Sequence, residues 1–132
     1  MTNPLIFAKP LTAVDEILHL DDDSIVGKKL IRVEEHFFKG HYPDFPIYPG
    51  VFVVESIAQT ARHYLHEHHL NATLTEVKTR FLNAVRPGDH VEFHLKMKKI
   101  DEGKTLRVIG KCLNNQIEAS TVKLFYKLES ES

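Results

Sequence analysis

The chain has 132 residues, of which 42% are hydrophobic and 27% charged, and its formal net charge is -1 at pH 7. This length suits one domain with a packed core, so residues 1–132 are treated as a single domain. The small net charge gives no indication of nucleic-acid binding. The sequence contains no run of about 18 apolar residues, so we expect no transmembrane helix. With no signal-peptide pattern and a single cysteine, Cys112, we expect a cytoplasmic protein without a disulfide.

The first half of the chain is predicted to contain two short elements and one long helix. Residues 14–20 are expected to form a strand or a short helix, and residues 24–33 a strand. Between residues 49 and 69, apolar side chains recur at three- and four-residue steps, which is helical spacing. Small residues on this stripe, Ala58 and Ala61, would let the helix approach a sheet closely.

The second half is typical of antiparallel strands. Residues 90–98 alternate strictly between apolar and polar, and a second alternating run follows at Leu106, Val108, Gly110 and Cys112. Residues 116–127 are rich in β-branched and aromatic side chains. Residues 76–85 are predicted as a further strand, which would make a four-strand meander in chain order. The turn signals between these runs are Pro87-Gly88, Glu102-Gly103 and Asn114-Asn115. One helix with five or six antiparallel strands predicts an α+β fold, with the sheet curled around the helix.

The segment before the helix is conformationally restricted and apolar. Its prolines and glycines are Gly40, Pro43, Pro46, Pro49 and Gly50. Each proline fixes its own φ and restricts the preceding residue, and aromatic side chains surround His41. A rigid, dry loop that holds a histidine and continues into a helix N-terminus indicates a reaction site.

The string GHYPDFPIYPGVFVVESIAQ, residues 40–59, resembles the signature of the β-hydroxyacyl-(acyl-carrier-protein) dehydratases of the hotdog fold. The positions that match with every spacing preserved are Gly40, His41, Pro43, Pro46, Ile47, Pro49, Gly50, Val51, Glu55, Ala58 and Gln59. Phe81 and residues 85–89 resemble the following strand and its Pro-Gly-Asp turn. The resemblance implies a hotdog fold, in which an antiparallel sheet wraps around a long central helix.

The resemblance also implies a catalytic pair, with His41 as the base and Glu55 as its partner. Dehydration needs one group to take a weakly acidic proton from C2 and another to protonate the hydroxyl that leaves C3. A histidine suits the first task and a protonated carboxyl group the second. Amides around Gly50 and Val51 would bind the oxygen of the enolate, and Gln59, one turn after Glu55, would orient that carboxyl group.

By the same resemblance, the expected partner is an acyl-carrier protein bearing a 3-hydroxyacyl phosphopantetheine. We expect a homodimer or a trimer of dimers with active sites shared between subunits, and neither a cofactor nor a metal. Carrier-docking candidates are Lys39, Arg62 and Arg86. The histidines at positions 63, 66, 68 and 69 complete no zinc motif and are expected at a surface helix end, where imidazoles favour the dipole.

Several positions depart from the family pattern and leave the acyl substrate open. An N-terminal Pro-His-Arg-type motif is absent, and Arg62 stands where a glycine is usual. Related isomerising enzymes carry aspartate at the position of Glu55 and cysteine at that of Gly40, so we predict dehydration without isomerisation. Both primary fatty acid synthesis and a specialised polyketide-type pathway fit these departures.

The alternative functions are a hotdog thioesterase and a non-catalytic acyl-thioester-binding protein. Cys112 is expected in the core rather than as a nucleophile.

Overall fold

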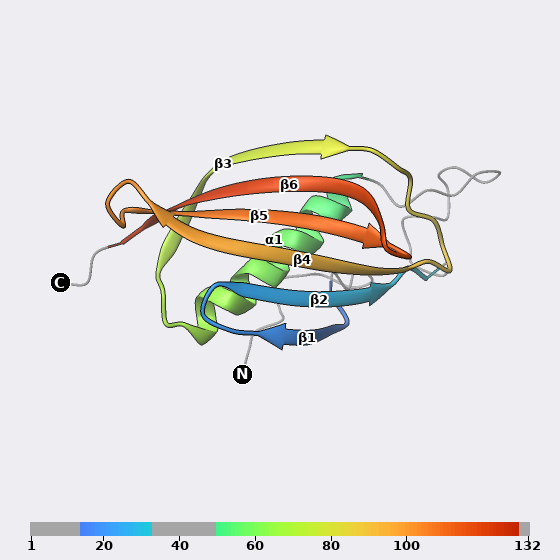
Figure 1. Ribbon diagram of the computed structural model, residues 1–132, viewed down its shortest axis with the longest axis horizontal. Helices are drawn as coiled ribbons and strands as arrows, with labels where there is room; N and C mark the ends of the chain where they lie inside the picture. The colour runs from blue at the N-terminus through green and yellow to red at the C-terminus, as the bar shows by residue number, and fades with distance from the viewer. Residues whose placement is uncertain (1–13, 33–49, 130–132) are drawn as a thin grey trace.

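The computed structural model describes residues 14–32 and 50–129. Its elements are β1 (Glu16–Leu20), β2 (Ser24–Leu30), α1 (Gly50–Glu67), β3 (Ala72–Phe81), β4 (His90–Ile100), β5 (Thr105–Asn114) and β6 (Ile117–Leu128). The strands form one six-stranded sheet in the order β1-β2-β4-β5-β6-β3, and α1 lies against one face of it (Figure 1). This arrangement confirms the α+β fold expected from the sequence. His41 and the rest of its loop lie outside the described residues.

The strand order corrects the predicted four-strand meander. Strands β4, β5 and β6 are consecutive antiparallel neighbours, but β3 pairs with β6, and β2 takes the free side of β4. Period-two alternation shows which side chains share a face of a sheet, but it does not identify the neighbouring strand. The meander in chain order was therefore wrong, and β3 lies at an edge of the sheet.

The bounds of β3 also differ from the prediction of residues 76–85. The strand runs from Ala72 to Phe81, because the next two amides, of Leu82 and Asn83, both donate to the carbonyl of Ala119 and end the ladder. Residues 16–20 form a strand, which settles the alternative left open there. The β5–β6 turn has Asn115 and Gln116 at φ values of 57° and 72°, the conformation of a two-residue hairpin that suits the twist of its strands.

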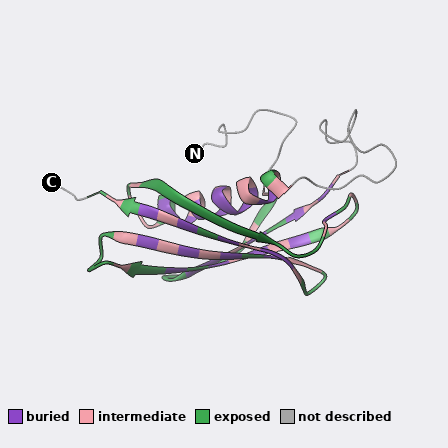
Figure 2. Cartoon of the chain, turned by 90° about the horizontal axis from the view of Figure 1, so that it is seen from above, coloured by how far each residue is buried: buried purple, intermediate pink, exposed green. Residues whose placement is uncertain are grey.

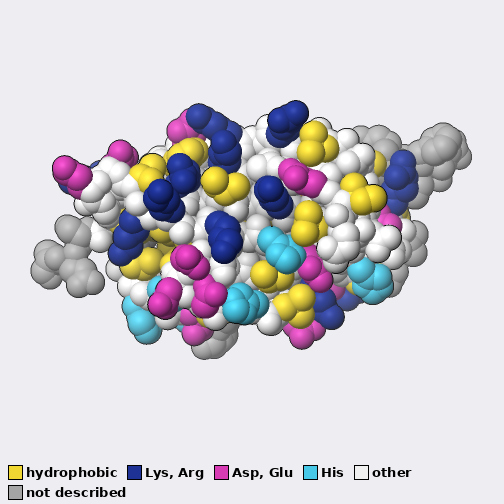
Figure 3. All heavy atoms as spheres, viewed as in Figure 1, with side chains coloured by type: hydrophobic (Ala, Val, Ile, Leu, Met, Phe, Trp, Pro, Cys, Tyr) yellow, Lys and Arg dark blue, Asp and Glu magenta, His cyan; other side chains and the backbone are white. Residues whose placement is uncertain are grey.

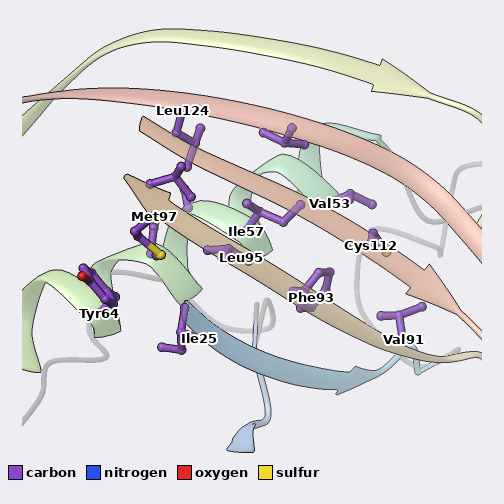
Figure 4. Packing of buried hydrophobic residues seen from close by; sticks show 14 of the residues in the cluster. Ile25, Val53, Ile57, Tyr64, Val91, Phe93, Leu95, Met97, Cys112 and Leu124 are labelled. Carbon is purple, nitrogen blue, oxygen red and sulfur yellow. The ribbon is translucent and has the colours of Figure 1, made fainter. Parts of the chain in front are cut away.

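The core lies between the buried face of α1 and the inner face of the sheet. Figure 4 shows Ile57 between the inward side chains of β4 and β5, and Ala58 and Ala61 are buried on the same helix. Close approach also depends on the sheet, because a Cβ atom at Gly110 would lie 2.7 Å from Cγ2 of Ile57. Cys112 is fully buried, as predicted, and desolvation raises the pKa of its thiol to about 12.

The two faces of the sheet differ in chemistry. Figure 2 shows buried residues alternating with intermediate and exposed ones along much of the central strands β4 and β5. On the outer face, lysine and arginine side chains gather over β4, β5 and β6, including the directly opposed pair Lys98 and Arg107 (Figure 3). The outer face is therefore a charged surface, and the helix-bearing face holds the core.

The histidine-rich end of α1 is anchored to the β1–β2 turn. The hydroxyl of Tyr64 donates to the carbonyl of Asp22 at 2.5 Å, and Nε2 of His68 lies 3.0 Å from the carbonyl of Asp21. His69 takes a positive φ of 55°, which ends the helix. Among residues 14–32 and 50–129, no three metal-ligating side chains gather into a group that could hold an ion. No helix in the same ranges is long and apolar enough to cross a membrane.

Candidate active site at the start of the helix

A pocket of about 540 Å³ opens at the N-terminus of α1. The first amides of a helix have no partners within it, so they are available to an oxygen that carries negative charge. The pocket is lined by Gly50, Val51, Val53, Phe81, Leu82, Asn83, Ala84, Val85, Ala119 and Ser120. Two of the predicted substrate-binding residues, Gly50 and Val51, thus face an empty space with mostly apolar walls.

The ring of Phe81 forms one wall of this pocket and lies directly over Gly50. A Cβ atom at position 50 would come within 2.9 Å of both Cζ and Cε1 of that ring. Because Gly50 has no side chain, the ring of Phe81 can pack directly against the backbone at the start of the helix. Phe81 was part of the family resemblance, but its position against the helix start could not be read from the sequence.

A β-bulge brings two consecutive side chains of β6 into the same pocket. The β5–β6 register shifts after Cys112, and Ala119 and Ser120 are both buried, which breaks the alternation of the strand. Bulges of this kind redirect a side chain, often beside a functional site. Sequence reasoning missed both residues. The available signal was a pair of small side chains within an otherwise alternating run.

The predicted acid Glu55 and its predicted support Gln59 lie together on one face of α1. Nη2 of Arg62 joins them, donating to Oε2 of Glu55 at 2.9 Å and to Oε1 of Gln59 at 3.2 Å. The apolar surroundings expected for the acid differ from what is found, because the Glu55 side chain is 38% exposed and ion-paired. The physical reason is that this face of the helix points away from the sheet that buries the opposite face.

Glu55 lies about one helical turn beyond the pocket. Val51 lines the pocket, and Glu55, four residues later, lies on a similar side of the helix but roughly 6 Å further along its axis. Glu55 is not among the described residues that form the pocket wall. Within the described part of one chain, the carboxyl group of Glu55, which the signature pairs with His41, therefore lies outside the pocket at the helix start.

A buried tyrosine lies within reach of the same charges. Burial raises the pKa of the Tyr126 hydroxyl to about 12, the positive charge of Arg62 lowers it, and the negative charge of Glu55 raises it further. Both charges therefore act on the phenol, which belongs to β6, the neighbour of the edge strand β3. Charges on the polar face of α1 therefore influence the ionisation of a tyrosine on β6.

Solved structures of low sequence identity share this architecture. A hypothetical thioesterase with coenzyme A from Streptococcus pneumoniae matches with a TM-score of 0.74 and 11% identity, covering 88% of this chain and 86% of that one. The dehydratase heterocomplex ApeI:P from Xenorhabdus doucetiae matches with a TM-score of 0.67 and 15% identity, covering 95% and 88%. At these identities the likeness shows the fold, which is the hotdog fold.

Sequence comparison is more specific. Residues 17–120 match the ApeI-like family, described as ApeI dehydratase, and the chain belongs to that family. It is 41% identical over 92 residues to the 3-hydroxyacyl-[acyl-carrier-protein] dehydratase FabZ of Agrobacterium fabrum, covering 65% of this chain and 60% of the relative. A FabZ of Methylobacterium radiotolerans is 38% identical over 106 residues, covering 74% and 66%. The chain thus spans less than two thirds of either relative.

Proposed function

We propose that this chain is a 3-hydroxyacyl-[acyl-carrier-protein] dehydratase that releases water and leaves a trans-2-enoyl thioester. The observation that carries the proposal is the 41% identity to an enzyme of that name, within a family described as dehydratases. The geometry supports it, because Gly50 and Val51 of the signature open onto a pocket, and Glu55 and Gln59 lie together on the same helix.

The proposed reaction uses one base and one acid. His41 takes the proton from C2, and negative charge moves onto the thioester oxygen, where the amides of Gly50 and Val51 stabilise it. The C3–O bond then breaks as Glu55 gives its proton to the departing hydroxyl, so that water leaves and the C2–C3 double bond forms. His41 ends protonated and Glu55 ionised, and one proton transfer between them through solvent restores the enzyme.

Two features support a second subunit at each site. The pocket at the helix start lacks the Glu55 of its own described chain. Within the described residues, edge strand β3 pairs on one side only, and it exposes Leu74, Val77 and Phe81. A long, exposed edge strand is a template for pairing with another strand, and the three apolar side chains would be covered by it. We therefore propose a homodimer joined along β3, which would bring each pocket toward the helix of the other subunit. A trimer of dimers remains a prediction.

The decisive experiment is mass spectrometry on carrier proteins loaded with 3-hydroxyacyl chains of different lengths. The expected product has lost one water and keeps its carrier. A free acid with a free carrier thiol would indicate a thioesterase instead, and binding without turnover would indicate a non-catalytic protein. A 3-enoyl product would contradict dehydration without isomerisation. The variants His41→Ala and Glu55→Gln should each lose roughly 10²- to 10⁴-fold in rate.

Mixing the two inactive variants tests the sharing of sites. Subunit exchange should give heterodimers with one intact site of two, so activity should return to a level set by their fraction. If exchange is shown by mass and no activity returns, each site is built from one chain. The Xenorhabdus relative was solved as a heterocomplex, so light scattering on the purified chain comes first. An inactive monomer would indicate that the second subunit is a different protein.

A further inference from the structure

Arg62 connects two positions of the signature, although it lies outside the signature itself. A single atom, Nη2, donates to Oε2 of Glu55 at 2.9 Å and to Oε1 of Gln59 at 3.2 Å. The three residues are spaced four and three apart along α1, which places them on one face. Arg62 also stands where the signature that this sequence resembles usually has glycine.

Stability does not account for the bridge. The side chains of Arg62 and Glu55 are 37% and 38% exposed, and ion pairs with such exposure contribute about 0–1 kcal/mol. A guanidinium group holds its donors in a rigid plane, whereas a lysine ammonium is a rotating point charge. The contact therefore defines the direction of the Glu55 carboxyl group more than it holds the helix in place.

We propose that Arg62 is a positioning residue that orients Glu55 as the proton donor, an inference that rests on the proposed dehydratase function. A guanidinium group can donate hydrogen bonds but cannot accept them. Oε2 of Glu55, which accepts from Arg62, is then turned away from the reaction. Oε1 is the oxygen that carries the proton to the C3 hydroxyl.

The same arrangement assists the step electrostatically. The proton passes from Oε1 to the oxygen leaving C3, that oxygen departs as water, and Glu55 is left with a negative charge. A positive charge already lies 2.9 Å from its other oxygen. Charge placed where an opposite charge develops lowers the barrier without any reorganisation. Arg62 should therefore act on the chemical step, in contrast to the carrier-docking role considered from the sequence.

The test is a double-mutant cycle of Arg62→Ala and Glu55→Gln, with steady-state kinetics on a 3-hydroxyacyl carrier protein. Arg62→Ala should lower kcat roughly 10- to 100-fold with KM changed less than about threefold, as expected for a misplaced catalytic group. Arg62→Lys should recover part of that loss. In the Glu55→Gln background, Arg62→Ala should have little further effect, because residues that act through each other are not additive.

A matched control is Lys96→Ala, which removes one positive charge from the exposed outer face of β4 and should leave both constants unchanged. A rise in KM alone for Arg62→Ala would overturn the inference in favour of carrier docking. An equal loss in both backgrounds would overturn it as well, since Arg62 would then act without Glu55.

A readout independent of activity separates this inference from the proposed function. In nitrogen-15 NMR spectra, Glu55→Gln should shift the guanidinium signals of Arg62 and the side-chain amide signals of Gln59, whereas Lys96→Ala should shift neither. If these shifts occur in a protein that dehydrates nothing, the proposed function fails and the bridge stands. If the protein dehydrates and the signals do not respond, the inference about Arg62 is wrong.

Discussion

The ring of Phe81 covers the backbone of Gly50 so closely that a Cβ atom there would lie 2.8 Å from Cζ of the ring. Phe81 is 52% exposed and can turn outward, so a small side chain at position 50 should move the ring rather than prevent folding. This relationship couples the edge strand β3 to the helix start at which the thioester is proposed to bind.

The variant Gly50→Ala should therefore fold but lose activity, by roughly tenfold or more, because a shift of about 1 Å in a reacting group has effects of that size. Circular dichroism should show an unchanged fold, and kinetics should show the loss. Adding Phe81→Leu, which removes the ring atoms at 2.8 Å and 2.9 Å, should restore part of the rate. A double variant no better than Gly50→Ala would mean that the ring is not the obstacle.

The contact between Gly110 and Ile57 gives a prediction about stability. Gly110→Ala would place its Cβ atom 2.7 Å from Cγ2 of Ile57, and overpacking of this kind costs about 1–3 kcal/mol in the free energy of unfolding. In an Ile57→Leu background the branched methyl group is gone, so the added cost should be smaller. Urea denaturation of the four proteins measures both values. Equal costs in the two backgrounds would show that the clash is relieved elsewhere.

The edge strand gives a prediction about assembly. Val77→Lys replaces an exposed apolar side chain of edge strand β3 with a charge, which pairing with a second copy would bury. Light scattering should show dimers of the wild type and monomers of the variant at the same micromolar concentration, with loss of dehydratase activity. Ile117→Lys, at an exposed apolar residue at the start of β6, is the matched control and should remain dimeric. A dimeric Val77→Lys protein would place the interface elsewhere.

Alkaline stability should depend on two buried acids. Burial raises the pKa of Cys112 from 9.0 to about 12 and that of Tyr126 from 10.0 to about 12. Folding thus favours their neutral forms, so this stabilisation is complete below the unfolded pKa values and is lost as pH rises from about 9 toward 12. Thermal melting should show a decline that begins near pH 9, and Cys112→Ala should move its onset toward pH 10. An unchanged onset would argue that other groups cause the decline.

The local periodicity of the chain explains why much of the fold was predictable. Residues 90–98 alternate strictly because successive side chains of a strand point to opposite faces of the sheet. The strand β4 starts at His90, as this pattern predicted. The neighbour of each strand depends on contacts far apart in the sequence. For that reason β3 was placed beside the wrong strand, and its last residues were assigned to a ladder that ends where Leu82 and Asn83 meet Ala119.

The sequence by itself determined the signature of residues 40–59 and the α+β class, because spacing and periodicity are local properties of the chain. Only the tertiary structure placed Phe81 over Gly50, turned Ala119 and Ser120 into one pocket, and left Glu55 outside the wall of that pocket. These relationships depend on a crossover, a β-bulge and the direction in which the helix packs. No local pattern specifies them, since each results from burying the apolar stripe of α1 against a particular order of strands.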